Sequence, residues 1–192
     1  MMPSSDASKL NAINNAKRWL DDKPVYIDSE TTGLEVADEI VEFSILDHDG
    51  GVLFDELVKP SRAIPPAASR IHGITNEMTA TAKNWPILWP TIRNLLYGRS
   101  IAAYNAPFDL RMMQQSHARY RLPWRENLKI VDVLALYSEF RGIWNPARGS
   151  LRYFKLEEAG SYFNVSLPNA HRSMADALLT RAVIHCIAGL PY

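Results

Sequence analysis

Two acidic residues, Asp28 and Glu30, stand at the end of a short apolar run in the stretch VYIDSETTGL, residues 25–34. Side chains two residues apart on an extended chain point to the same face of a strand. Two carboxylates held side by side repel each other, which raises their pKa values unless a cation lies between them. Hard divalent cations such as Mg²⁺ bind oxygen ligands of this kind. A solvated pair at a strand end explains the same spacing, so the pair alone leaves both interpretations open.

Other acidic residues follow at places where strands end and helices begin. Asp109 lies in AAYNAPFDLRMM, where a short apolar strand gives way to a helix for which Asn105 is the expected N-cap. A carboxylate in a first helical turn also stabilises the helix dipole, which is the structural alternative for Asp109. Asp132, at the end of KIVDV, is expected to cap the following helix and to take no part in chemistry.

The segment NAHRSMADALLTRAVIH places a histidine and an acid close to one helix start. His171 is expected in the loop before the helix, from which its side chain can reach a site that a helical carboxylate faces. Asp176 is the candidate carboxylate. Ser173 and Asp176 also have the spacing of a capping box, so a purely structural role for Asp176 stays open.

Taken together and in order, these motifs resemble those of the DEDDh family of 3′–5′ exonucleases, which includes polymerase proofreading subunits, ribonuclease T and oligoribonuclease. The family motif D-x-E-T-T-G matches residues 28–33, H-N-x-x-F-D matches residues 104–109, and H-x-x-x-x-D matches residues 171–176. The segment IHGIT, residues 71–75, also resembles a family segment. The resemblance covers roughly residues 24–188.

The resemblance implies hydrolysis of phosphodiester bonds at a 3′ end with release of nucleoside monophosphates. It implies two divalent cations, Mg²⁺ or Mn²⁺, and His171 as the base that takes a proton from the attacking water. The implied metal ligands are Asp28, Glu30, Asp109 and Asp176.

The resemblance further implies a binding surface for the terminal nucleotide, in which Leu34 is an apolar wedge against the base. Its other implied contacts are Thr31, Thr32, Gly33, His72, Tyr104, Asn105 and Phe108. Phe108 is equally well explained as a core residue under its helix. Two positions depart from the family pattern, because Tyr104 replaces a histidine and Ser173 stands where alanine is common. We expect these two residues to tune substrate contacts and helix capping.

The elements that must position these residues follow from periodicity and turn signals. Strands are predicted at 25–28, 39–46, 51–58, 100–103 and 128–133. Helices are predicted at 6–20, 86–97, 107–119, 133–141, 155–163 and 174–188. Three consecutive strands should form an antiparallel meander, and the last two should add parallel to the first by right-handed crossovers. This order predicts an α/β fold with a mixed five-stranded sheet flanked by helices, which the family resemblance identifies as ribonuclease H-like.

The length of 192 residues suits a single domain, with residues 24–192 as the exonuclease domain and residues 1–23 as an N-terminal helical extension. Cys186 is the one cysteine, which excludes an internal disulfide and fits a reducing cytoplasm. No apolar run approaches the length of a membrane span, and no apolar signal segment opens the chain. A cytoplasmic protein that does not enter membranes is therefore expected.

The net charge is zero, but the charges are unevenly distributed. Residues 20–60 hold twelve Asp or Glu against two Lys, and residues 111–155 hold nine Arg or Lys against three acids. Within the basic part, the stretch RGIWNPARGSLRYFK, residues 141–155, is the best candidate for a loop that faces a nucleic-acid strand. The alternative is that the acidic and basic segments simply form two solvent-exposed surfaces of opposite charge, with no role in binding.

Two rival functions remain at this point. The first is a catalytically inactive exonuclease-like fold that serves as a binding or scaffold module. The second is a ribonuclease H-type endonuclease or integrase, which shares the fold and catalysis by two metal ions. The expected substrate is a single-stranded or frayed 3′ end, with DNA favoured and RNA or short oligonucleotides open. A freestanding enzyme is favoured over one bound to a DNA polymerase, and a homodimer stays open.

Overall fold

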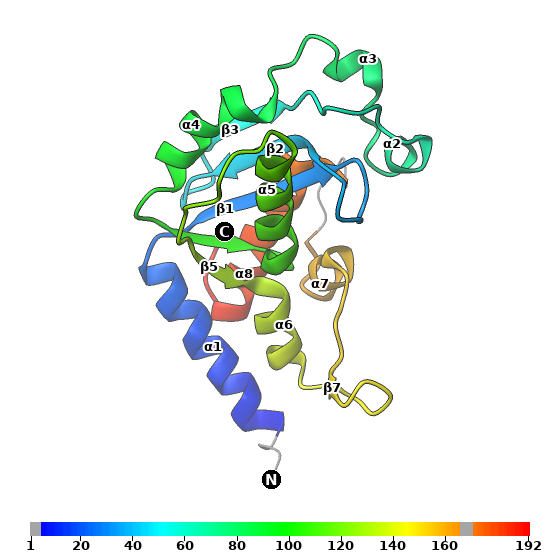
Figure 1. The fold of residues 1–192 in the computed structure, drawn as a ribbon. Helices are drawn as coiled ribbons and strands as arrows, with labels where there is room; N and C mark the ends of the chain where they lie inside the picture. Colours follow the sequence, from blue (N-terminus) through cyan, green and yellow to red (C-terminus); the bar gives the residue numbers. More distant parts are fainter. Residues whose placement is uncertain (1–4, 166–170) are drawn as a thin grey trace.

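The computed structural model describes residues 5–165 and 171–192. Its centre is a five-stranded sheet in the order β3-β2-β1-β4-β5, with helices on both faces (Figure 1). The predicted sheet composition and strand directions are confirmed. Residues 1–4 of the predicted N-terminal extension lie outside the described residues.

The first three strands form the predicted antiparallel meander. They are β1 (Val25–Thr31), β2 (Ile40–Leu46) and β3 (Val52–Leu57). The strand β1 extends three residues beyond its predicted end at Asp28, because Ser29 and Glu30 continue the ladder with β2. Asp28 and Glu30 therefore belong to one regular strand and project to one face of the sheet.

The last two strands of the sheet run parallel to β1, as the crossover rule predicts. They are β4 (Ser100–Ala103) and β5 (Lys129–Asp132). The helix α5 (Ala106–Arg119) follows β4, and α6 (Val133–Arg141) follows β5. The carboxyl ends of parallel strands meet at one edge of a sheet, so this edge receives the residues that follow each strand.

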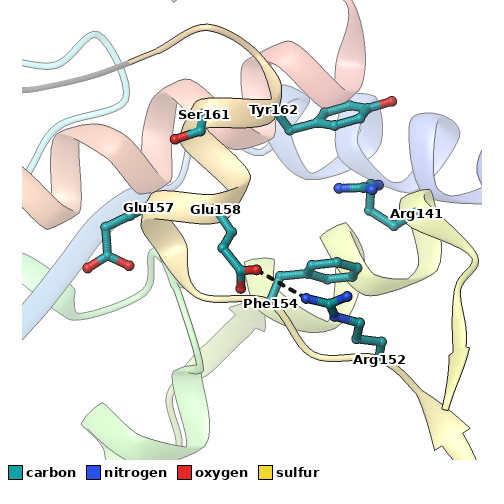
Figure 2. Close-up of a pocket in the computed structure, with 7 residues that line it drawn as sticks. All are labelled: Arg141, Arg152, Phe154, Glu157, Glu158, Ser161 and Tyr162. Atoms are coloured by element: carbon teal, nitrogen blue, oxygen red, sulfur yellow. Dashed lines mark hydrogen bonds and ion pairs between the residues drawn. The ribbon is translucent and has the colours of Figure 1, made fainter.

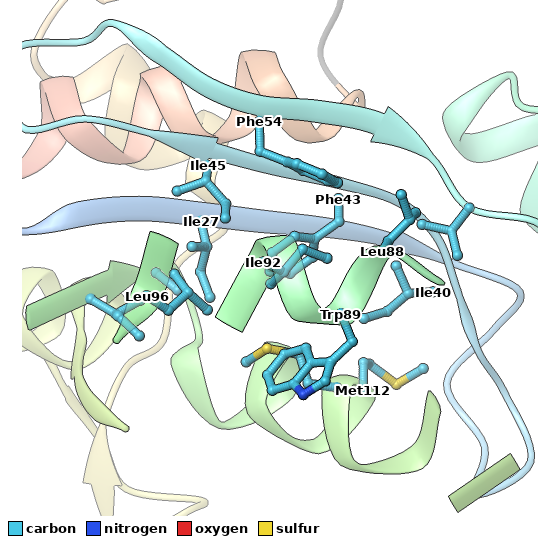
Figure 3. Packing of buried hydrophobic residues seen from close by; sticks show 14 of the residues in the cluster. Ile27, Ile40, Phe43, Ile45, Phe54, Leu88, Trp89, Ile92, Leu96 and Met112 are labelled. Carbon is cyan, nitrogen blue, oxygen red and sulfur yellow. The ribbon is translucent and has the colours of Figure 1, made fainter. Parts of the chain in front are cut away.

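Alternating side chains divide the sheet between two apolar cores. On one face, Ile27, Phe43 and Ile45 pack against α4 (Trp85–Leu96) and α5, as Figure 3 shows around Trp89 and Met112. On the other face, residues of β1 and β2 pack against α1 (Ser5–Asp21), α6 and α8 (Ser173–Ala188). The face that carries Asp28 and Glu30 is the one that α8 covers.

The N-terminal helix is part of the second core. Ala12 and Ala16 of α1 are fully buried against α6 and α8. Asn11 also donates a 2.6 Å hydrogen bond to Glu139 of α6. The helix predicted at residues 6–20 is confirmed, and its small buried residues allow the close approach to its two neighbours.

The remaining elements connect these layers. They are the helices α2 (Pro66–His72), α3 (Asn76–Thr79) and α7 (Leu156–Tyr162) and the strands β6 (Trp144–Asn145) and β7 (Ser150–Leu151). The stretch 141–155 is thus not a simple loop, because it contains the short hairpin of β6 and β7. Among the residues that the structure describes, no helix has both the length and the apolar character needed to cross a membrane.

Candidate active site

Three carboxylates converge at one edge of the sheet. Asp28 and Glu30 come from β1, and Asp176 comes from the first turn of α8. A carboxylate oxygen of each residue lies within 4.8 Å of those of the other two. The strand register explains the arrangement, because Asp28 opposes Ser44 and Glu30 opposes Glu42 on the face under α8. The fold therefore brings together acids that are almost 150 residues apart in the chain.

Burial and mutual repulsion raise the pKa values of these acids. The pKa of Glu30 rises to about 8, first because its carboxyl group is buried and then because Asp176 and Glu42 lie near it. The pKa of Asp176 rises to about 6, again mainly through burial. Burial also raises the pKa of Asp28 well above its ordinary value, and the neighbouring acids add to the shift. Concentrated negative charge at a half-buried place favours protons or cations over three free carboxylates.

Asp109 approaches the same cluster from the other face of the sheet. It lies in the first turn of α5, is 2% exposed, and accepts a 2.7 Å hydrogen bond from Ser29 Oγ. Burial raises its pKa to about 7. Asp109 is not one of the three acids whose oxygens lie within 4.8 Å of one another, but its charge contributes to the raised pKa of Asp28.

His171 lies immediately before α8, in a left-handed backbone conformation with φ of 66°. Electrostatic attraction to His171 lowers the pKa of Asp176, against the stronger effect of burial. Its side chain is 49% exposed, and its Nε2 lies 3.8 Å from Glu157 Oε1 of α7. The structure therefore connects the predicted base both to a carboxylate of the cluster and to a second acid. The motifs did not indicate Glu157.

A buried ion pair fixes the segment that carries His171. Glu42 is 2% exposed, and it accepts hydrogen bonds from Arg172 Nε at 2.9 and 3.1 Å and from the Ser173 backbone N–H at 2.9 Å. Arg172 also reaches Glu42 through a second guanidinium nitrogen. No motif in the sequence points to Glu42 or Arg172, so sequence reasoning missed this pair.

The capping-box alternative at the start of α8 does not hold. Arg172 occupies the N-cap position and makes no side-chain capping hydrogen bond. Ser173 is fully buried, and its hydroxyl lies 2.6 Å from that of Ser44 on β2. The hydroxyl is used to join α8 to the sheet, which leaves Asp176 free of a capping role.

A pocket of about 350 Å³ opens beside the carboxylates. Leu34, 72% exposed, lies at its lip, and Phe108 and His72 form part of its walls. Six of the eight predicted substrate contacts line this pocket: Thr31, Thr32, Gly33, Leu34, His72 and Phe108. Glu30 also lines it, so the pocket and the acid cluster are continuous.

Internal hydrogen bonds hold the walls of this pocket in place. His72 Nδ1 accepts a 3.0 Å hydrogen bond from the Ile74 backbone N–H, which leaves Nε2 to donate to the Thr31 carbonyl at 3.2 Å. Burial lowers the pKa of His72, in keeping with this neutral form. Thr32 Oγ1 donates to Asp38 at 2.7 Å. Hydrogen bonds at Thr31 and Thr32 thus fix the backbone at the end of β1, just before Leu34.

Tyr104 and Asn105 do not line the pocket, although the motif places them next to Phe108. The Tyr104 hydroxyl donates to the Phe154 carbonyl at 2.9 Å. Asn105 makes no side-chain cap for α5; instead Asp132 Oδ1 accepts from the Asn105 backbone N–H at 3.0 Å. Asn105 thus occupies the predicted N-cap position, but with a left-handed φ of 66° its side chain makes none of the capping hydrogen bonds that the prediction implied. The predicted cap at Asp132 is confirmed by its bond from the Leu134 N–H.

Known proteins with similar sequences or folds are nucleases and polymerase subunits. The family model RNase_T, described as an exonuclease, matches residues 25–184. An uncharacterized exonuclease of Escherichia phage 186 is 35% identical over 179 residues, covering 90% of this chain and 92% of that protein. DNA polymerase III subunit epsilon of Treponema pallidum is 30% identical over 169 residues, covering 82% of this chain and 75% of that protein.

The solved structure of E. coli Exonuclease I in complex with a dT13 oligonucleotide superposes with a TM-score of 0.69. The two chains are 22% identical, and the match covers 85% of this chain and 40% of that one. At this level of identity the likeness concerns the fold, and it confirms the predicted ribonuclease H-like architecture.

Proposed function

This chain belongs to the RNase_T exonuclease family, and from that premise we propose that it removes nucleoside monophosphates from the 3′ end of a nucleic-acid strand by the DEDDh mechanism. The convergence of Asp28, Glu30 and Asp176 beside an apolar pocket is the observation that supports the proposal most strongly. Single-stranded DNA is the favoured substrate, with RNA second. The E. coli Exonuclease I structure is a complex with an oligonucleotide, which is consistent with this choice.

The donor set fits two hard divalent cations, Mg²⁺ or Mn²⁺. Asp28, Glu30 and Asp176 offer only carboxylate oxygens, and burial raises the pKa of each, so a cation would relieve their repulsion. Asp109 would support the same ions from the opposite face. When bound, two such ions would stabilise the charge on the phosphoryl group and on the leaving oxygen.

His171 is positioned to receive the proton of the attacking water. Its ring is accessible, and the carboxylate of Glu157, 3.8 Å from Nε2, would stabilise the imidazolium that proton transfer creates. The two bonds between Glu42 and Arg172 Nε hold the neighbouring backbone, which restricts where the ring can go. In this proposal the protein supplies a base, an orienting acid and a rigid support.

The pocket around Leu34 would hold the terminal nucleotide. Its lining is mostly apolar, which suits the faces of a base, and Leu34 at the lip can separate that base from its neighbour. Because Glu30 forms one edge of the pocket, a nucleotide held there presents its phosphate to the acid cluster. The pocket thereby determines which bond is cleaved.

Digestion of end-labelled substrates tests the proposal. Single-stranded DNA, duplex DNA, RNA and circular single-stranded DNA are each incubated with Mg²⁺, with Mn²⁺ and with EDTA. We expect release of 3′-terminal mononucleotides from linear strands, fastest from single-stranded DNA, and only with a divalent cation. Cleavage of the circle would favour the endonuclease rival, activity in EDTA would overturn the metal assignment, and inactivity on every substrate would favour the binding module.

The variant His171→Ala is expected to reduce turnover by about 10²–10⁴-fold, the usual contribution of a general base. KM should change little, because His171 does not line the pocket of Leu34. Steady-state kinetics on a linear oligonucleotide measure both quantities. His48→Ala, which removes a histidine of the turn after β2, serves as the control. Hydrolysis by His171→Ala at a rate close to that of the unchanged protein would remove His171 from the mechanism.

A further inference from the structure

A second cavity, of about 550 Å³, lies along α7 (Figure 2). Two arginines and two aromatic rings form much of its lining: Arg141, Arg152, Phe154 and Tyr162. Glu157 also belongs to the lining, and its carboxylate lies 3.8 Å from Nε2 of His171. The cavity therefore begins next to the candidate active site and extends away from it along α7.

Arg141 is a cation held in place by aromatic rings. Its guanidinium lies 4.2 Å from the ring centre of Tyr162 and 4.8 Å from that of Phe154. It also donates a 2.8 Å hydrogen bond to the Tyr137 hydroxyl. Rings and a hydroxyl restrict the guanidinium without neutralising its charge, and within the described parts of the chain it has no carboxylate within ion-pair distance. A preorganised, uncompensated arginine is well suited to a phosphate, which its planar group can bind through two hydrogen bonds.

Arg152 and Glu158 neutralise each other within the cavity, which leaves Arg141 and Glu157 as its other charged groups. Arg152 lies over the Phe154 ring at 4.8 Å and forms a 3.1 Å ion pair with Glu158. Glu158 also accepts a 2.8 Å hydrogen bond from the Lys155 backbone N–H. Glu157 lies on α7 away from the two arginines (Figure 2), and its carboxylate is close to Nε2 of His171. The net attraction for an anion thus centres on Arg141.

The cavity is coupled to the catalytic edge of the sheet through Tyr104. The Tyr104 hydroxyl donates to the Phe154 carbonyl at 2.9 Å, and Tyr104 directly follows β4. Tyr104 does not itself line the cavity, but the residue whose carbonyl it holds, Phe154, does. Tyr104 would contribute to substrate binding by holding Phe154 in place, without contacting the nucleic acid.

We propose that this cavity binds the phosphates and bases of the strand that lie upstream of the scissile bond. The inference rests on the proposed function, since it places a nucleic-acid strand in the active site. Arg141 would bind a phosphate, and the ring of Tyr162, a residue 46% exposed, would stack with a base. Phosphates and base faces are common to DNA and RNA. The site would therefore make longer strands bind more tightly, whatever their base sequence.

Binding of fluorescein-labelled oligonucleotides of about 3 and about 12 nucleotides tests the inference, with anisotropy measured in EDTA so that hydrolysis is prevented. Arg141→Ala is expected to raise Kd for the longer oligomer roughly tenfold, the effect of losing one charge-assisted hydrogen bond. It should also lower the slope of log K against log salt by about one between about 50 and 200 mM. The shorter oligomer should lose much less affinity. Oligothymidylate and oligouridylate of the same lengths separate DNA from RNA.

Arg125→Ala is the matched control, because Arg125 is exposed and lines a different cavity, before the start of β5. Its Kd should equal that of the unchanged protein. Arg141→Lys, which keeps the charge, should recover the salt slope but not the full affinity, and it guards against misfolding of the alanine variant. Equal Kd values for Arg141→Ala and Arg125→Ala, or equal losses at both lengths, would overturn the inference. These results are independent of hydrolysis, so a failure of the exonuclease proposal would be recognised separately.

Discussion

Asp28→Asn is expected to abolish hydrolysis and to raise the melting temperature of the metal-free protein. The change keeps the shape of the side chain but removes the charge that Glu30 and Asp176 repel. Each 1 kcal/mol of repulsion removed should raise the melting temperature by about 2–4 °C in a protein of this size. Activity should fall at least about 10³-fold, because removing one electrostatic stabiliser already costs about 10²–10³-fold. Activity assays and thermal unfolding in EDTA measure the two effects.

The same charges make the stability of the metal-free protein depend on pH. Folding raises the pKa of Glu30 from 4.5 to about 8 and that of Asp176 from 3.8 to about 6, so the folded state binds protons more tightly than the unfolded chain. Stability should therefore fall as pH rises from about 4 to about 8. Asp28→Asn should weaken this fall, and added Mg²⁺ or Mn²⁺ should raise the melting temperature of the unchanged protein more than that of the variant.

Asp21→Asn is the control for this experiment, since it removes an exposed carboxylate at the end of α1, away from the cluster. It should leave activity, melting temperature and pH dependence unchanged. Two results would contradict repulsion among the carboxylates of the cluster. One is a lower melting temperature of Asp28→Asn in EDTA. The other is stabilisation of Asp28→Asn by divalent cations as strong as that of the unchanged protein.

Arg172→Met is expected to destabilise the fold by about 3 kcal/mol, the lower end of the range for breaking a buried ion pair. The lower end applies because the Arg172 side chain is 41% exposed, whereas that of Glu42 is 3% exposed. Without Arg172, the carboxylate of Glu42 would stay buried opposite Glu30, with the Ser173 N–H as its remaining hydrogen-bond donor among the described contacts. Urea denaturation measures the loss.

The double variant Glu42→Gln with Arg172→Met should recover much of this stability, because no charge is then left without a partner. Turnover should stay low in the double variant, since the segment that carries His171 has lost its anchor. Arg172→Lys should retain part of both stability and turnover. If the double variant were as unstable as Arg172→Met, the cost would come from lost packing and not from the buried charge.

The fold was predictable where local pattern and tertiary burial agree. The alternation of Val41, Phe43 and Ile45 predicted β2, and turn residues around Gly50 predicted the hairpin to β3. Prediction failed where a partner distant in sequence decides the local conformation. The backbone of Asn105 is left-handed, and Asp132, far along the chain, accepts the hydrogen bond from its N–H. The hairpin of β6 and β7 was missed because two-residue strands carry no measurable alternation.

The sequence by itself determined the family, the strands of the sheet and their directions, because motif spacing and strand periodicity are local properties of the chain. Which carboxylates meet, and what surrounds them, only the tertiary structure decided. The strand register places Glu42 opposite Glu30, and Arg172 at the N-cap of α8 neutralises the Glu42 carboxylate. The position of α7 brings Glu157 to His171. Distances and burial across the sheet depend on how separate elements pack, and no local pattern in the chain encodes them.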